Sequence, residues 1–119
     1  MTREFVYMQT FDKQWIGAKL TDEQLRELEV YLCENPEAGD MIQGTGGLRK
    51  LRWALPGKGK SGSIRTLYVD FAYFEQIYMI SCFKKSAKEN LSQSEKKQIK
   101  SVIEQIKANL RKQGGKNEK

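Results

Sequence analysis

The spacing of apolar and polar residues along the chain predicts four strands and three helical segments. The expected strands cover residues 3–9, 48–55, 64–71 and 77–83. The expected helical segments are a short turn at 11–16, a helix at 21–34 and a final helix that begins at Ser92. The last three strands follow one another directly, which favours antiparallel pairing. The order β-α-α-β-β-β-α therefore predicts a small antiparallel sheet covered by helices, in the α+β class.

Both long helices carry a recognisable start. Thr21 is followed three residues later by Gln24, and Ser92 by Glu95, which is the spacing of a capping box. The apolar stripe of the final helix consists of Ile99, Val102, Ile103, Ile106 and Leu110. Beyond Gln113 the sequence has nothing to bury, so we expect one domain over residues 1–113 and a disordered tail over 114–119.

Charge is distributed unevenly along this chain of net charge +6. Residues 1–40 carry four Lys or Arg against nine Asp or Glu, whereas residues 84–119 carry eleven against four. The segment between Asp40 and Asp70 has no acidic residue, and its six cations are Arg49, Lys50, Arg52, Lys58, Lys60 and Arg65. A basic surface without carboxylates attracts polyanions, so the phosphates of RNA or DNA are the first partner to consider.

Other classes of site fit the sequence poorly. The glycine-rich stretches 44–47 and 57–62 each lack a glycine that the dinucleotide and P-loop fingerprints require, so we expect these glycines to serve turns. The chain has no histidine, and Cys33 and Cys82 are far apart, which predicts no metal site, no cofactor and no histidine-based triad. No apolar run is long enough to span a membrane and the N-terminus does not resemble a signal peptide, so a cytoplasmic location is expected.

Without histidine, any acid–base catalysis falls to Lys, Arg, Tyr or carboxylates. A lysine among other cations has a lowered pKa and can accept a proton. Such a base could take the proton of an RNA 2′-hydroxyl, whose oxygen attacks the adjacent phosphate while arginines neutralise the developing charge. From charge alone, a solvated basic face that binds nucleic acid without cleaving it is the simpler interpretation. The aromatic side chains of Trp53, Tyr68 and Tyr78 are expected to pack in the core rather than to stack on bases.

Several stretches together resemble one known family. They are GDMIQGTGGLRKLR at residues 39–52, GKGKSG at 57–62, RTLY at 65–68 and FKKS at 83–86. In this combination the chain, from Phe5 to about Leu110, is similar to the RelE/HigB-type toxins of bacterial type II toxin–antitoxin systems. The resemblance implies a RelE-like domain that acts as a metal-independent mRNA endonuclease on translating ribosomes and so inhibits translation. It also implies contact with ribosomal RNA and neutralisation by a helix-turn-helix antitoxin of the HigA type.

The resemblance further suggests roles for individual residues. Arg65 matches the family's strand arginine that contacts the scissile phosphate, and Lys85 matches a candidate acid/base near the end of the last strand. The candidate RNA contacts are Arg49, Lys50, Arg52, Lys58 and Lys60. The candidate catalytic residues are Arg65, Lys60, Lys84 and Lys85. Where many relatives carry a tyrosine or histidine this chain has Phe83, which leaves Lys84 or Lys85 as the better candidate for the general base.

Two other functions are compatible with the same residues. A ParE-like toxin would share the fold and act on a protein target such as DNA gyrase, so DNA damage signalling would precede the fall in translation. A non-catalytic regulator would use the basic face only to bind nucleic acid, with a steep dependence on salt and no cut products.

Overall fold

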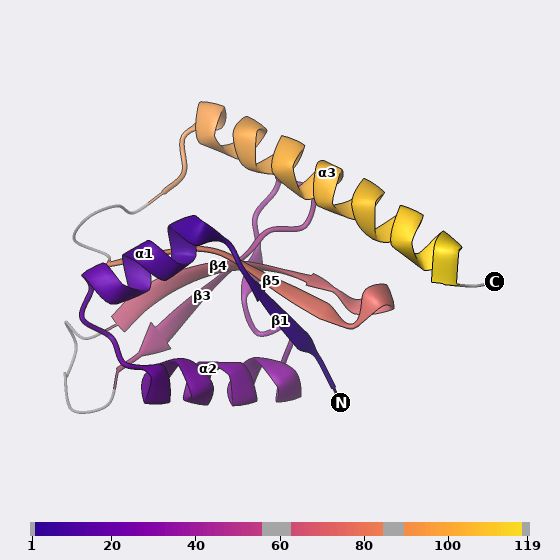
Figure 1. Ribbon diagram of the computed structural model, residues 1–119. Coiled ribbons are helices and arrows are strands. Elements are labelled where there is room, and N and C mark those ends of the chain that lie inside the picture. Colours follow the sequence, from indigo (N-terminus) through magenta and orange to yellow (C-terminus); the bar gives the residue numbers. More distant parts are fainter. Residues whose placement is uncertain (1, 56–62, 85–89, 118–119) are drawn as a thin grey trace.

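The structure is a computed structural model that describes residues 2–55, 63–84 and 90–117. Its helices and strands follow the predicted order closely (Figure 1). The elements are β1 (Glu4–Tyr7), α1 (Gln9–Gly17), α2 (Asp22–Glu34), β2 (Asp40–Met41), β3 (Arg49–Ala54), β4 (Ser63–Phe71), the 3-10 turn η2 (Ala72–Phe74), β5 (Gln76–Lys84) and α3 (Gln93–Asn117). The predicted α+β class is therefore confirmed. The structure also has one short strand, β2, that was not predicted.

The five strands form one sheet in the order β1-β5-β4-β3-β2. Strands β3, β4 and β5 pair antiparallel, as predicted, and the added strand β2 pairs antiparallel with β3, but the edge strand β1 runs parallel to β5. The expectation of a purely antiparallel sheet was wrong in this one pair, and the sheet is mixed. The reason is that most of the chain separates β1 from β5, so no short hairpin forces them into opposite directions.

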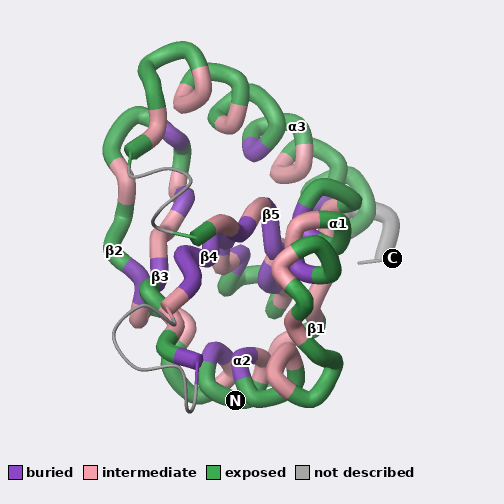
Figure 2. Tube along the Cα trace, turned by 90° about the vertical axis from the view of Figure 1, so that its left-hand side faces the viewer, coloured by how far each residue is buried: buried purple, intermediate pink, exposed green. Residues whose placement is uncertain are grey.

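Helices cover both faces of the sheet, and each face has its own apolar core. Figure 1 shows α3 on one side of the sheet and α2 on the other. The core beneath α1 and α2 contains Phe11, Trp15, Leu28, Leu32, Leu51, Ile64, Tyr68, Ile77, Met79 and Cys82. The core beneath α3 contains Leu48, Leu67, Val69, Phe71, Ile80, Ile103 and Leu110. We call these sides the α1/α2 face and the α3 face. Figure 2 shows buried residues concentrated in the central strands β4 and β5 and on the inner sides of the helices.

The helix starts are those that the sequence predicts. The amide of Gln24 donates to the Thr21 hydroxyl, and the Gln24 side chain accepts from the Thr21 amide. Ser92 and Glu95 form the same reciprocal pair at the start of α3. Helix α3 continues to Asn117, so residues 114–117 are helical where a disordered tail was expected. The two glycines there lower helix propensity without removing any backbone donor, so the hydrogen-bonded turns can continue through them. Residues 118–119 lie outside the described part of the chain.

The glycines of residues 44–47 serve the turn between β2 and β3. Gly44, Gly46 and Gly47 have φ values of 80°, 80° and 123°, a region that L side chains rarely adopt. Between them Thr45 is fully buried; its hydroxyl donates to the Ile42 carbonyl at 2.6 Å and accepts from the Leu48 amide at 3.1 Å. The motif is therefore built as a turn, as expected. Among the described residues, none of the helices combines the length and the apolar character needed to cross a bilayer.

Candidate nucleic-acid interface

Three predicted site residues lie on the same face of the sheet. Leu51 packs in the α1/α2 core, so its neighbours Lys50 and Arg52 point to the α3 face by strand alternation. Leu67 packs in the α3 core, which places Arg65 on that face as well. The register pairs Arg52 with Arg65 and Lys50 with Leu67. The sheet thus brings Lys50, Arg52 and Arg65 together on adjacent strands.

Arg65 occupies the centre of a short row across three strands. Its partner on β3 is Arg52 and its partner on β5 is Phe83. Arg65 is only 5% exposed, and its Nη1 donates to the Ser63 hydroxyl at 3.3 Å. Within the described residues no carboxylate forms an ion pair with it. A guanidinium held in place without a carboxylate can offer its remaining donors to an anion such as a phosphate.

Arg49, by contrast, lies on the α1/α2 face and has structural partners. Its Nη1 donates to the Gly39 carbonyl at 2.7 Å and to the Glu37 carbonyl at 3.3 Å. The buried Tyr68 holds the same segment, because its hydroxyl accepts from the Gly39 amide and donates to the Pro36 carbonyl, both at 2.9 Å. Arg49 therefore fixes the chain that leads from α2 to β2, and the structure does not bring it next to Arg65.

The remaining predicted site residues are separated from Arg65 or lie outside the described residues. Lys84 is the register partner of Ile64, which packs in the α1/α2 core, so alternation directs Lys84 away from the α3 face. Lys58, Lys60 and Lys85 lie in the two segments that the structure does not describe, 56–62 and 85–89.

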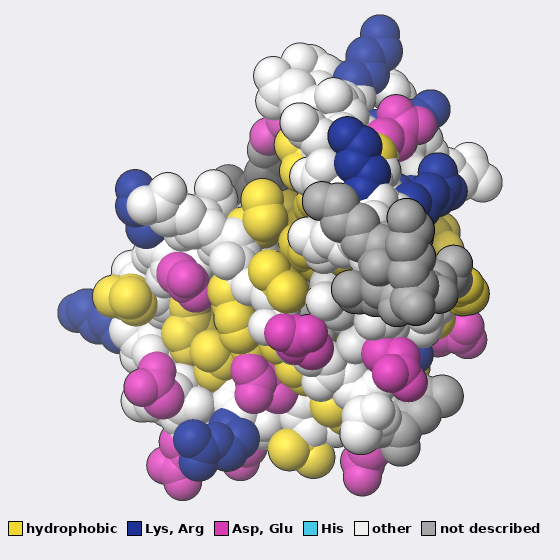
Figure 3. Space-filling view, turned by 45° about the vertical axis from the view of Figure 1, so that its right-hand side comes forward, with side chains coloured by type: hydrophobic (Ala, Val, Ile, Leu, Met, Phe, Trp, Pro, Cys, Tyr) yellow, Lys and Arg dark blue, Asp and Glu magenta, His cyan; other side chains and the backbone are white. Residues whose placement is uncertain are grey.

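Two hollows lie against the α3 face, and they differ in chemistry. The larger, of about 580 Å³, runs between α1, β5 and α3 and is mainly apolar, and none of the described residues that line it is a lysine or an arginine. Figure 3 shows apolar side chains gathered on this side of the molecule between its body and α3. The smaller, of about 130 Å³, is lined by Ile42, Lys50, Leu67, Phe83, Asn90, Leu91 and Lys96. Lys96 was not among the predicted site residues; it continues the seven-residue spacing of the buried Ile103 and Leu110.

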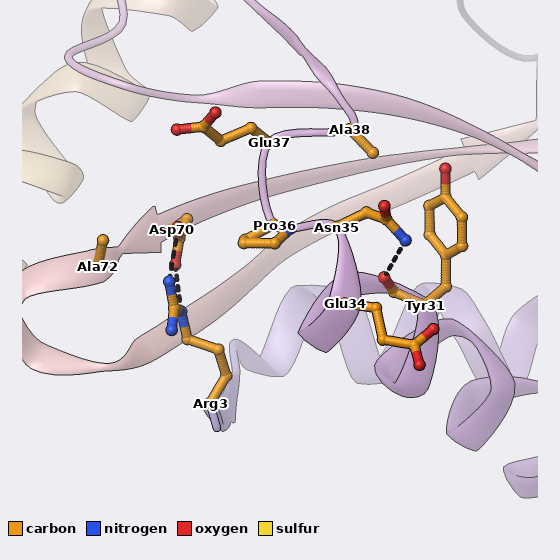
Figure 4. A pocket seen from close by; sticks show the side chains of 9 residues that line it. All are labelled: Arg3, Tyr31, Glu34, Asn35, Pro36, Glu37, Ala38, Asp70 and Ala72. Atoms are coloured by element: carbon orange, nitrogen blue, oxygen red, sulfur yellow. Dashed lines mark hydrogen bonds and ion pairs between the residues drawn. The ribbon is translucent and has the colours of Figure 1, made fainter. Parts of the chain in front are cut away.

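A third hollow has the wrong charge for a polyanion. It measures about 650 Å³ and lies between the end of α2 and strand β4, with Glu34, Glu37 and Asp70 in its lining (Figure 4). Its cation, Arg3, is bonded to Asp70, with Nε 2.8 Å from Oδ1, and this bond raises the pKa of the guanidinium. The free carboxylates would repel phosphate, so this hollow is not part of the interface.

The cysteines and acidic groups offer no alternative chemistry. Burial raises the pKa of the Cys82 thiol to about 12, so this side chain stays protonated and unreactive near neutral pH. Among the described residues no group of three or more Cys, Asp or Glu side chains is placed to hold a metal ion. The aromatic residues pack as predicted: Tyr68 is fully buried, Trp53 packs against Tyr31 with the two rings tilted by 50°, and Tyr78 meets Phe71 edge to face.

Comparison with known proteins agrees with this architecture. The structure of a mutant of the E. coli toxin RelE in the free state matches with a TM-score of 0.53 and 24% identity, over 75% of this chain and 90% of that one. The intact E. coli RelBE toxin–antitoxin complex matches with a TM-score of 0.50 and 23% identity, over 70% of this chain and 96% of that one. At these identities the matches show a shared fold. The family model of the RelE toxin of the RelE/RelB toxin–antitoxin system matches residues 5–114, which is nearly the whole chain, and the protein therefore belongs to the RelE toxin family.

Proposed function

We propose that this RelE-family toxin, as a member of the HigB-type subgroup, is an mRNA endonuclease that cuts messages on the ribosome in the cytoplasm and so inhibits translation. The observation that carries the proposal is the position of Arg65, a nearly buried guanidinium without a carboxylate partner among the described residues, beside Arg52 and close to Lys50. A nearly buried guanidinium that bonds the Ser63 hydroxyl but no carboxylate of the described residues adds little to stability, because taking its charge out of water is costly. Its presence favours a role in binding an anion.

The proposed reaction is an internal transfer at one phosphodiester. The 2′-oxygen of the ribose forms a bond to phosphorus as the bond to the 5′-oxygen of the next nucleotide breaks. The 2′-hydroxyl loses its proton to a base and the leaving 5′-oxygen takes up a proton from that group or from water, which leaves a 2′,3′-cyclic phosphate and a 5′-hydroxyl. Arg65 binds the non-bridging oxygens and stabilises the negative charge that develops on them, and Arg52 binds the neighbouring backbone. No metal is needed for this step, because the arginines supply the positive charge.

The proton of the 2′-hydroxyl needs an acceptor near Arg65. Phe83, its cross-strand partner, has no ionisable group. Because Lys84 belongs to the α1/α2 face, we assign proton transfer to Lys85 or Lys60, which are predicted candidates outside the described residues. A cationic neighbourhood lowers the pKa of a lysine and so favours the neutral form that can accept a proton.

The proposed partner that silences the toxin is an antitoxin encoded with it. The E. coli structure with the same fold is a toxin bound to its antitoxin, and the family is described by the same pairing. On the HigB-type resemblance, we propose that this antitoxin is a helix-turn-helix protein similar to HigA.

The test is a cleavage assay with end-labelled mRNA, both free and bound to programmed ribosomes. The purified wild type should cut only the ribosome-bound message, at one position, and Arg65→Ala should not cut it. Arg111→Ala removes an exposed arginine of α3 and is the matched control, which should cut like wild type. Cleavage by Arg65→Ala at the wild-type rate would contradict the proposal. An absence of cut products with every variant would instead favour the ParE-like or the non-catalytic function.

A further inference from the structure

The small cavity on the α3 face is built around two lysines. Lys50 of β3 and Lys96 of α3 both line it, together with Phe83 and Leu67. Leu67 is the register partner of Lys50, and Phe83 is the register partner of Arg65. On this face of the sheet, the pair of Lys50 and Leu67 is next to the pair of Arg52 and Arg65. The cavity is therefore adjacent to Arg65.

Both lysines occupy positions where the pattern of the fold would place apolar side chains. Lys96 precedes Ile103 and Leu110 at intervals of seven residues, and those two are buried, the only such residues in the part of α3 whose side chains the structure describes. Lys50 is two residues after Leu48, which is fully buried in the α3 core. Each lysine is half-buried. A lysine at the end of an apolar stripe packs against the core less well than an apolar side chain would. A binding role is the simplest reason for a lysine there.

Among the residues that the structure describes, no carboxylate lines the cavity. No ion pair to Lys50 or Lys96 occurs within residues 2–55, 63–84 and 90–117. Asp40 is the register partner of Lys50 on β2, but it is exposed and forms no ion pair with it. Because Lys50 and Lys96 both line the cavity, an anion bound in it would lie near two positive charges.

The size and lining of the cavity fit a phosphate group. Its volume of about 130 Å³ is a few times the roughly 30 Å³ that a water molecule occupies, which suits a phosphate group rather than a whole nucleotide. We propose that this cavity binds a backbone phosphate of the RNA, adjacent to the phosphate at Arg65, with Lys50 and Lys96 as its ligands. The inference rests on the proposed function and extends it, because it makes the first turn of α3 part of the RNA-binding surface.

The test measures RNA binding separately from cleavage. The probe is a fully 2′-O-methylated RNA oligonucleotide, which cannot be cut, and its affinity is measured by fluorescence anisotropy over a series of salt concentrations. Lys96→Gln should lower the affinity about tenfold, which is about 1.4 kcal/mol, and should reduce the slope of log K against log salt by about 0.7. Lys96→Arg keeps the charge and should bind like wild type. Lys97→Gln is the matched control, because it removes an exposed lysine from the same turn without touching the cavity.

A calorimetric titration with inorganic phosphate identifies the source of the ligand. Heat of binding with wild type and Lys97→Gln but not with Lys96→Gln, together with unchanged RNA affinity in Lys96→Gln, would assign the cavity to free phosphate and overturn the RNA ligand. The absence of heat, together with the loss of RNA affinity in Lys96→Gln, would support a phosphate presented by RNA. Equal RNA affinity and salt slope in Lys96→Gln and Lys97→Gln would overturn the proposal. These readouts do not depend on cleavage, so a failure of the endonuclease assay leaves them interpretable.

Discussion

Arg65 on β4 and Phe83 on β5 are cross-strand partners on the face of the sheet that α3 covers. A side chain in the position of Phe83 is therefore a direct neighbour of the guanidinium that we propose binds the scissile phosphate. Phenylalanine offers only its ring there, and proton transfer must come from elsewhere. The Arg65–Phe83 pair therefore leads to a prediction about whether proton transfer limits the rate of cleavage.

Phe83→Tyr should increase the rate of mRNA cleavage on the ribosome. The new phenol would lie beside Arg65, whose charge lowers the pKa of a nearby phenol and makes it a better proton acceptor. General acid–base catalysis contributes about 10²–10⁴-fold when well placed, so we expect a gain of at least tenfold. The rate is measured by single-turnover cleavage of end-labelled mRNA over a range of pH.

The control for this change is Phe83→Leu, which keeps the position apolar. It should cleave no faster than wild type and should have the same pH profile. A Phe83→Tyr variant that behaves like Phe83→Leu would mean that proton transfer at this position does not limit the reaction.

Arg65→Met should raise the free energy of unfolding by about 1–2 kcal/mol while it abolishes cleavage. The guanidinium is nearly buried without a carboxylate partner in the described structure, and an apolar side chain of similar length removes that desolvation cost. Urea denaturation followed by circular dichroism measures the change. Leu67→Ala on the same face should instead lower the stability by about 2–5 kcal/mol. A large loss of stability in Arg65→Met would show that the arginine has a structural role.

Cys33 and Cys82 should differ sharply in their reaction with iodoacetamide. Cys82 is buried and its pKa of about 12 leaves very little thiolate at pH 8, whereas Cys33 is half-buried on α2. We expect alkylation of Cys33 alone in the folded protein and of both in 6 M guanidinium, read by peptide mass spectrometry. Reaction of Cys82 in the folded protein at the rate of Cys33 would mean that β5 opens readily.

Much of the fold could be predicted because its signals are local. The capping boxes at Thr21 and Ser92 marked both helix starts, and apolar runs marked the three long strands. The parallel pairing of β1 with β5 depends on a contact between distant parts of the chain, for which no local pattern exists. Similarly, sequence could group six cations into one segment but could not divide them between faces. That division depends on which face the strand packs against: Leu51 packs beneath α1 and α2, so Arg49 lies on that side of the sheet and Arg52 on the other.

The pair Arg49 and Arg52 provides the sharpest test of that division. They lie on one strand, three residues apart, and differ in face and in partners. Arg49 donates to the Gly39 and Glu37 carbonyls, whereas Arg52 is exposed and faces the side of Arg65. Arg49→Met leaves the carbonyl of Gly39 without this donor, so it should lower the free energy of unfolding by about 1–3 kcal/mol and change RNA affinity little.

Arg52→Met should show the opposite behaviour. Its stability should stay within about 0.5 kcal/mol of wild type, because an exposed side chain without structural partners is removed. Its affinity for the 2′-O-methylated RNA should fall, with a salt slope lower by about 0.7, because one phosphate contact is lost. Both variants are measured by urea denaturation and by anisotropy under identical conditions. If Arg49→Met weakened RNA binding as much as Arg52→Met, the α1/α2 face would also have to contact RNA, and the interface would not be confined to the α3 face.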